Sequence, residues 1–265
     1  MPISALKTAV AAAREAGKIL MNAYNGTPAS LDVTYKKYRE PVSIVDFESN
    51  DAIIRRLTRA FPKDNIVSEE SKGLDAPSSD WSGATWIIDP LDGTNNYISH
   101  IPLFAVVIGR IQDGVPTLGV IYDPLHGEMF AAEKGKGAKM NGKPIHVSNR
   151  DVTRGAMLFA GRGFRDHDRA RHGKIIYALE RQTPYFRRLG SAAQMLAGVA
   201  CGRADAAILT GNKPWDTVAG MVLIEEAGGK VTDYCGRHWT VKSEDLVATN
   251  SAIHKHLIDI TKKKA

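Results

Sequence analysis

The 265-residue chain has little cysteine, few aromatic residues and no long apolar run. Cys201 and Cys235 form no CxxC pair and have no metal-ligand spacing, which excludes a disulfide scaffold and predicts buried, reduced thiols. No segment approaches the about 18 uncharged apolar residues of a membrane span. The Ala-rich N-terminus is interrupted by Arg14, Glu15 and Lys18, so it does not resemble a secretory signal. We therefore expect a cytoplasmic protein without membrane partners.

Composition and length indicate an ordinary globular protein. Hydrophobic residues make up 43% of the chain and charged residues 24%, which excludes a disordered or fibrous class. The length suffices for one large domain or two packed units with a buried core. Lys and Arg exceed Asp and Glu by 35 to 29, and a net charge of +6 suits an anionic partner.

The positive charge is concentrated in the second half. Residues 1–145 hold 16 basic and 17 acidic residues, whereas residues 146–265 hold 19 and 12. We therefore expect two units, 1–148 and 149–265, although plain surface charge is the simpler explanation. A nucleic-acid-binding regulatory protein using the basic half is an alternative. Its aromatic residues form no recognisable RNA-binding motif, so nucleic acid is the less favoured partner.

Hydrophobic spacing predicts helices and strands along the whole chain. The first half should contain helices over 4–24 and 46–60, followed by strands at 65–68, 85–89, 104–110, 117–122 and 128–133. Hairpin spacing of the later strands predicts an antiparallel sheet. Beyond residue 155 strands and helices alternate, which is α/β in character. The expected strands there are 157–160, 204–209, 230–233 and 246–249, and the expected helices are 166–181, 191–201, 215–227 and 251–262.

The most informative segment is WIIDPLDGTNN, residues 86–96. An apolar strand delivers Asp89, Pro90 is expected to end the strand's ladder, and Asp92 follows. Two such carboxylates repel each other unless a cation lies between them. Oxygen ligands select hard divalent cations such as Mg2+. Asp-Pro and Asp-Gly are also common turn pairs, so a simple turn is the alternative.

Three other acidic residues stand where they would complete such a cluster. Glu69 follows the short strand 65–68, Asp46 begins the second helix, and Asp216 begins the helix over 215–227. Each also has an ordinary explanation. Glu69 would be a solvated turn residue, and the two aspartates would cap their helices.

Together these segments resemble the inositol monophosphatase family of lithium-sensitive, Mg2+-dependent phosphatases. The resemblance spans almost the whole chain and is carried by PVSIVD (41–46), VSEES (67–71), WIIDPLDGTNN (86–96), LGSAA (189–193) and WDTVAG (215–220). It implies an α+β fold, a layered α-β-α-β-α sandwich with an antiparallel N-terminal sheet and a mixed C-terminal one. The site would lie between the two units. The family also implies a homodimer, with the apolar region near 99–106 as a contact.

The resemblance implies two or three Mg2+ ions per site, with Mn2+ as a substitute. Glu69, Asp89 and the carbonyl of Leu91 would hold the first ion. Asp89, Asp92 and Asp216 would hold the second, and Glu69 would face a third, weaker one. Two cations bridging a phosphate neutralise developing charge and lower the pKa of bound water.

The resemblance also assigns catalytic and substrate-binding residues. Asp46 and Thr94, with Glu69, would orient and deprotonate the attacking water, and the N–H groups of Gly93 and Thr94 would hold the phosphate. The implied substrate contacts are Gly190, Ser191, Ala192, Arg162 and Asp216. Because every side chain of the family's metal and water site is present, a catalytically dead scaffold is disfavoured. The expected substrate is a small polyol or sugar phosphate.

Two departures from the family pattern affect the substrate. Members favouring inositol phosphate carry a glutamate seven positions before the W-D aspartate, where this chain has Leu209. Losing that acceptor costs about 1–3 kcal/mol for a desolvated hydroxyl. The family's Gly-Ser-Ser-Arg loop reads GRGFR over 161–165. Arg162 there would suit a second phosphate or carboxylate, with a solvated loop as the alternative.

We therefore rank inositol monophosphate first and fructose 1,6-bisphosphate second, and leave adenosine 3′,5′-bisphosphate and histidinol phosphate open. Lys36 or Lys37 falls near a family lysine that contacts metal-bound water or phosphate, and the spacing does not decide between them. His100 is read as a loop histidine in preference to a general acid.

Overall fold

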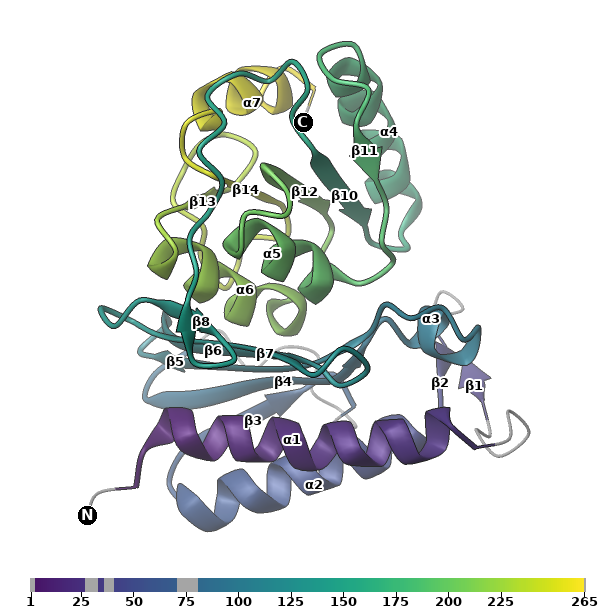
Figure 1. The fold of residues 1–265 in the computed structure, drawn as a ribbon, viewed down its shortest axis with the longest axis vertical. Coiled ribbons are helices and arrows are strands. Elements are labelled where there is room, and N and C mark those ends of the chain that lie inside the picture. Colours follow the sequence, from purple (N-terminus) through teal and green to yellow (C-terminus); the bar gives the residue numbers. More distant parts are fainter. Residues whose placement is uncertain (1–2, 27–32, 36–40, 71–80, 265) are drawn as a thin grey trace.

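A computed structural model describes residues 3–26, 33–35, 41–70 and 81–264, and its elements form five layers (Figure 1). The order is a helical layer, a seven-stranded sheet, a second helical layer, a five-stranded sheet and a third helical layer. The three helical layers contain α1 (Ala5–Tyr24) with α2 (Ile44–Ala60), then α5 (Ala192–Ala200) with α6 (Pro214–Glu226), and α4 (Asp166–Glu180) with α7 (His254–Thr261). The predicted α-β-α-β-α sandwich is confirmed.

The seven-stranded sheet follows the order of the chain. Its strands are β3 (Asn65–Ser68), β4 (Ala84–Asp92), β5 (Ala105–Gln112), β6 (Val115–Asp123), β7 (Glu128–Glu133), β8 (Ala138–Met140) and β9 (Lys143–Pro144). All neighbours pair antiparallel except β3 and β4, which are parallel. The prediction of a wholly antiparallel sheet was therefore wrong at this edge. Residues 69–83 separate β3 from β4, and a parallel pair needs a crossover of about that length.

The five-stranded sheet is mixed, as expected. Its order is β11 (Phe186–Arg187), β10 (Leu158–Arg162), β12 (Ala206–Thr210), β14 (Leu246–Thr249) and β13 (Lys230–Thr232). β10 pairs parallel with β11 and β12, and the remaining pairs are antiparallel. The chain passes from the first sheet to the second between Pro144 and Leu158, which includes the predicted boundary at 148/149. That boundary stays a prediction.

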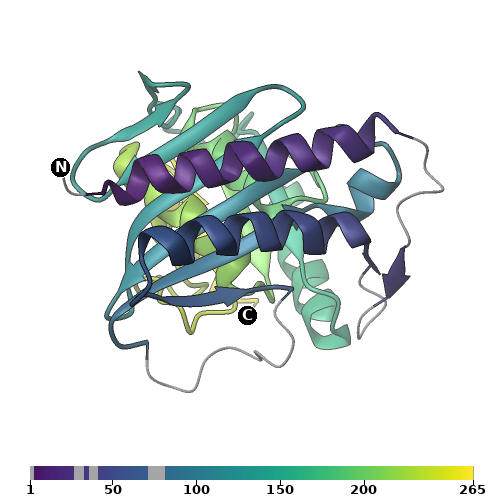
Figure 2. The same cartoon turned by 90° about the horizontal axis from the view of Figure 1, so that it is seen from below.

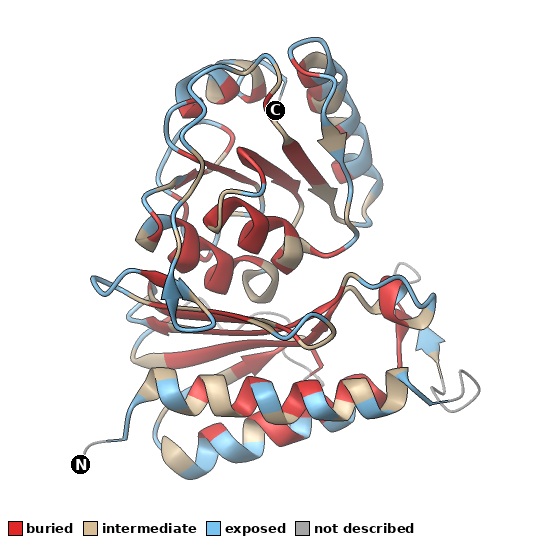
Figure 3. Cartoon of the chain, viewed as in Figure 1, coloured by how far each residue is buried: buried red, intermediate tan, exposed pale blue. Residues whose placement is uncertain are grey.

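Small side chains let the outer helices lie close to the first sheet. α1 and α2 run side by side across its face (Figure 2). α1 buries Ala9, Ala12, Ala13 and Ala16 against it. Figure 3 shows the same helices exposed on their outer sides. The periodic pattern found in the sequence thus corresponds to one buried stripe.

The inner layer joins the two sheets into one core. Ile87 and Val107 of the first sheet share a hydrophobic cluster with Leu196 of α5 and Val218 of α6. α6 approaches β6 so closely that a Cβ on Gly119 would lie 2.2 Å from the carbonyl oxygen of Ala219. This close contact fixes the start of α6 relative to the first sheet.

Several short elements were not predicted, namely β1 (Thr34–Tyr35), β2 (Pro41–Val42), β8, β9, β11 and α3 (Thr94–Ile98) beyond its first turn. The cysteine prediction was wrong for Cys235, which is exposed, whereas Cys201 is partly buried. Cys235 lies in a tight turn, where its N–H donates to Asp233 Oδ1 at 2.8 Å and Gly236 follows at φ +83°. Among the described residues, no helix has the length and apolarity needed to span a bilayer.

Candidate functional site

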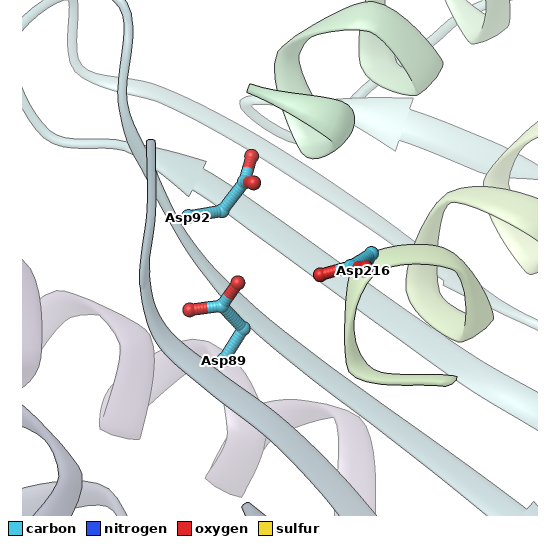
Figure 4. Close-up of side chains that lie close together, drawn as sticks. All are labelled: Asp89, Asp92 and Asp216. Atoms are coloured by element: carbon cyan, nitrogen blue, oxygen red, sulfur yellow. The ribbon is translucent and has the colours of Figure 1, made fainter. Parts of the chain in front are cut away.

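Three aspartates from distant parts of the chain meet between the two sheets. Asp89 and Asp92 come from β4 and Asp216 from the first turn of α6 (Figure 4). Each offers a carboxylate oxygen that lies within 4.8 Å of the other two. Asp89 is 2% exposed and Asp92 is 7% exposed. Asp216 is partly buried, so this is an oxygen-only donor set with two buried members.

A β-bulge lets both aspartates of β4 face the same way. Side chains three residues apart lie on opposite faces of a regular strand. Here Asp89 pairs with Val107 and Asp92 with Ala105, so three steps along β4 match two along β5. The strand therefore continues through Pro90, contrary to the prediction that Pro90 would end it. The bulge accommodates the missing N–H of proline.

Asp92 also links the first sheet to α5. Its carboxylate accepts a hydrogen bond from the Ser191 hydroxyl. It further accepts the backbone N–H groups of Ala192 at 3.2 Å and Ala193 at 2.8 Å. These donors form the N-terminus of α5, where a negative charge is favoured. The predicted substrate contacts Ser191 and Ala192 are thus directed at Asp92, and Gly190 lines the cavity beside them.

Burial and mutual repulsion disfavour ionised carboxylates here. The pKa of Asp89 lies well above its usual range, first because of burial and then because of the charges on Glu69, Asp92 and Asp216. Burial raises the pKa of Asp92 to about 6, although hydrogen bonds from Ser191 and α5 oppose the shift. A divalent cation would relieve this repulsion, so the donor set fits one.

Glu69 lies close to the cluster without joining its inner group. It follows β3, and its N–H donates to the Ile88 carbonyl at 3.0 Å. It lines the same cavity as Asp92 and Asp216. Its charge contributes to the raised pKa of Asp89. Glu69 is not among the three residues whose oxygens lie mutually within 4.8 Å, so its role as a ligand stays a prediction.

A second carboxylate–hydroxyl pair lies beside the aspartates. The Thr94 hydroxyl lies 3.2 Å from Asp46 Oδ1 and 3.0 Å from the carbonyl oxygen of Leu91. Asp46 Oδ2 accepts both the N–H and the hydroxyl of Ser43, at 2.9 and 2.6 Å. Asp46 therefore caps α2 and also reaches Thr94. Burial raises its pKa, which these hydrogen bonds partly counter.

Gly93 allows the turn between the aspartates and Thr94. It adopts φ +92°, a left-handed conformation that favours glycine. A Cβ there would also lie 2.9 Å from the carbonyl oxygen of Leu103. The side chain of Asn96, the second asparagine of this segment, donates from Nδ2 to the carbonyls of Leu103 and Leu189, each at 2.7 Å. The DGTNN segment thus fixes α3 against the chain that leads into α5.

The cluster opens into a cavity of about 430 Å3. Arg162, at the end of β10, lines it as the sequence predicted. Sequence reasoning did not assign the other basic lining residues, Arg165, Arg169, Arg188 and Lys213, as site residues. All four fall in the basic half of the chain, and no motif marks them as part of a site.

The remaining predicted residues lie elsewhere. Leu209 is fully buried in β12 and does not line the cavity. Its side chain lies behind Gly161, within 2.9 Å of where a Cβ would stand. His100 is exposed and its ring packs against Tyr24 at 4.9 Å, which confirms a loop position. Lys36 and Lys37 fall outside the described residues.

The layered fold and its carboxylate cavity place the chain in a known class of proteins. The sequence model of the inositol monophosphatase family matches residues 3–264, and the chain belongs to that family. Among curated relatives, it is 42% identical over 233 residues to the Nus factor SuhB of Xylella fastidiosa, covering 88% of this chain and 82% of that protein. It is 37% identical over 254 residues to the Nus factor SuhB of Escherichia coli K12, covering 96% and 94%.

Solved structures agree with this assignment. The extragenic suppressor protein suhB from Bartonella henselae matches with a TM-score of 0.89 and 33% identity over 98% of both chains. The inositol monophosphatase from Anabaena matches with a TM-score of 0.83 and 36% identity, covering 98% of this chain and 96% of that one. Family membership and these neighbours support a phosphatase.

Proposed function

We propose that the chain is a Mg2+-dependent phosphomonoesterase acting on a small phosphorylated substrate. The observation that carries this proposal is the trio Asp89, Asp92 and Asp216, of which Asp92 and Asp216 line a cavity. Carboxylates this close together repel one another, two of the three are buried, and a divalent metal is the partner that their chemistry fits.

The trio would hold the metal, and Glu69 and the carbonyl of Leu91 would complete the ligands. When bound, the cations would neutralise charge on the phosphate and lower the pKa of water. Mn2+ offers similar oxygen coordination and should substitute for Mg2+.

The chain itself would supply the proton acceptor and the phosphate donors. The Thr94 hydroxyl, held by Asp46, would orient the attacking water. A proton of this water would move to the Asp46 carboxylate. A carboxylate with a raised pKa is better matched to neutral pH as a base. The N–H groups of Gly93 and Thr94 would donate to phosphate oxygens where negative charge develops.

For the substrate, we retain inositol monophosphate first and fructose 1,6-bisphosphate second. Adenosine 3′,5′-bisphosphate and histidinol phosphate remain further candidates. The proposal includes lithium sensitivity, a cytoplasmic location and a homodimer. The exposed side chain of Ile101, 43% accessible in the loop that the sequence marked as a contact, supports the last point.

The test is phosphate release from these esters with Mg2+, with Mg2+ and Li+, and with EDTA. Asp89→Asn should lower kcat/KM by at least about 100-fold, the effect of losing one strong electrostatic group. The same variant should lose the thermal shift that Mg2+ causes in the wild type. Asp166→Asn is the matched control, because the Asp166 carboxylate is fully exposed. Full turnover by folded Asp89→Asn would refute the metal assignment.

A second candidate is a regulatory protein that binds nucleic acid, and the relatives named Nus factor SuhB favour testing it. Eight basic residues fall between 162 and 188. However, Arg165 and Arg171 pair with Glu244 and Asp245, each at 2.7 Å, which reduces the charge available to phosphates. Binding to an RNA oligomer that weakens steeply with salt would support this candidate.

A further inference from the structure

One cavity is lined by two groups of opposite charge. Glu69, Asp92 and Asp216 supply the acidic group, and the basic group consists of Arg162, Arg165, Arg169, Arg188 and Lys213. The acidic group is accounted for by the proposed metal. The basic group is used by no step of the proposed hydrolysis.

The arginines of the cavity differ in their carboxylate partners. Arg165 donates to Asp168 and to Glu244, each at 2.7 Å, so it is already paired. The Arg162 guanidinium instead has one hydrogen bond to protein among the described residues, to the adjacent carbonyl of Gly163 at 3.2 Å.

The other two arginines are also weakly compensated. Arg169 lies 3.9 Å from Asp166, and both side chains are exposed, so the pair contributes little. No ion pair joins Arg188 to a carboxylate within the described ranges. Asp168 lines the cavity too, but Arg165 already donates to both of its carboxylate oxygens.

The three arginines are close enough to repel one another. Burial lowers the pKa of Arg162, and the charges of Arg188 and Arg169 lower it further. Arg162 is partly buried and the other two arginines are exposed, and clustered like charges are unfavourable without an anion. A guanidinium fork binds phosphate oxygens with two parallel hydrogen bonds, so an incoming phosphate would satisfy the group.

Phe164, Met195 and Trp215 also line the cavity. These three side chains offer no acceptor for the hydroxyl groups of an uncharged polyol. An anionic group would gain the most from the arginines, because a guanidinium binds oxyanions with charge-assisted hydrogen bonds.

We infer that Arg162, Arg169 and Arg188 form a subsite for a second phosphate, so that a small bisphosphate is hydrolysed in preference to the monophosphate that lacks this second group. This inference rests on the proposed phosphatase function and narrows its substrate class. One phosphate would lie at the aspartates and be hydrolysed, while the other would be held by the arginines.

The test compares fructose 1,6-bisphosphate with fructose 1-phosphate, which carry the same 1-phosphate. The wild type should favour the bisphosphate by about tenfold or more in kcat/KM, the scale of one hydrogen-bonded charge pair. Arg162→Met and Arg188→Met should each bring this ratio toward one, mainly by raising KM for the bisphosphate. A general defect of the site would lower kcat/KM equally for both substrates and leave their ratio unchanged.

Arg187→Met is the matched control for Arg188→Met. Arg187 is the adjacent residue, is exposed and does not line the cavity. It should keep the wild-type ratio. If Arg162→Met does not fold, the exposed position 188 carries the test alone. A wild-type ratio near one, or a ratio unchanged in the folded variants, would overturn the subsite.

Failure of the phosphatase proposal gives a different result. If neither ester is hydrolysed, calorimetry with the same two compounds in Mg2+ measures binding directly. Tighter binding of the bisphosphate that is lost in Arg188→Met would support the subsite even then. Equal binding of both esters would overturn it.

Discussion

Replacing Gly119 by alanine should push α6 away from the first sheet. Gly119 lies in β6, and a Cβ there would stand 2.2 Å from the carbonyl oxygen of Ala219 and 2.8 Å from its Cα. These are backbone atoms of a helix, so no side chain can turn aside. The separation must open by about 0.8 Å before it reaches 3.0 Å, below which Cβ contacts essentially do not occur.

The displacement should cost both stability and activity. Overpacking a well-filled core costs about 1–3 kcal/mol. Ala219 lies one helical turn beyond Asp216, so a shift of α6 also moves this carboxylate relative to Asp89 and Asp92. Misplacing a group in an active site by about 1 Å costs up to about 100-fold in rate. We expect the loss of activity to exceed what the unfolded fraction explains.

The measurements are urea unfolding, phosphate release with Mg2+ and the Mg2+ concentration at half-maximal activity. Gly173→Ala is the control, since a Cβ at that exposed site in α4 meets nothing within 4 Å. The reasoning would be refuted if Gly119→Ala kept wild-type stability and turnover. A stability loss with unchanged turnover and Mg2+ requirement would refute the link between α6 packing and the site.

Three further changes follow from the structure. Gly173→Ala should raise the free energy of unfolding by about 0.5–1 kcal/mol, because glycine weakens a helix interior, and an unchanged urea midpoint would contradict this. Ser191→Ala should cost about 1–3 kcal/mol, because it removes the cap of α5 and a donor to Asp92, and a matching rise in the Mg2+ requirement should accompany it. The loss in free energy of unfolding caused by His254→Asn should be about 2–3 kcal/mol smaller at pH 4.5 than at pH 7, as urea unfolding in EDTA would show. Burial lowers the pKa of His254 to about 4, so the neutral ring stabilises the fold at pH 7 and this term is lost as pH falls from 6.5. An equal cost at both pH values would rule out that explanation.

The sequence was sufficient for the long elements and for the acidic residues of the site. The hydrophobic spacing predicts α1 and β7, and the sequence motifs alone point to Asp89, Asp92 and Asp216 as members of one cluster. Such features depend on local pattern and on short motifs, which one sequence carries.

What escaped prediction depends on contacts between distant segments. The continuation of β4 through Pro90 requires the bulge against β5, which hydrophobic spacing does not reveal. The parallel pairing of β3 with β4 was missed because the residue pattern that predicts a strand does not show whether the strand pairs parallel or antiparallel. Arg188 could be counted as a charge, but its place in the cavity depends on where β11 joins the second sheet.

From the sequence alone, helix capping by the aspartates of the site and their membership of a carboxylate cluster were alternatives. In the fold the same side chains do both. Asp216 Oδ2 accepts the N–H of Lys213 at 2.7 Å, as a cap of α6, while its carboxylate lies in the trio. Asp46 caps α2 through Oδ2 and meets Thr94 through Oδ1. Asp92 likewise receives the first N–H groups of α5. A cap bond fixes the rotamer of a carboxylate, and helix N-termini stabilise its charge. The starts of α2, α5 and α6 can therefore hold several carboxylates together against their repulsion, which explains how the cluster forms where the two sheets meet.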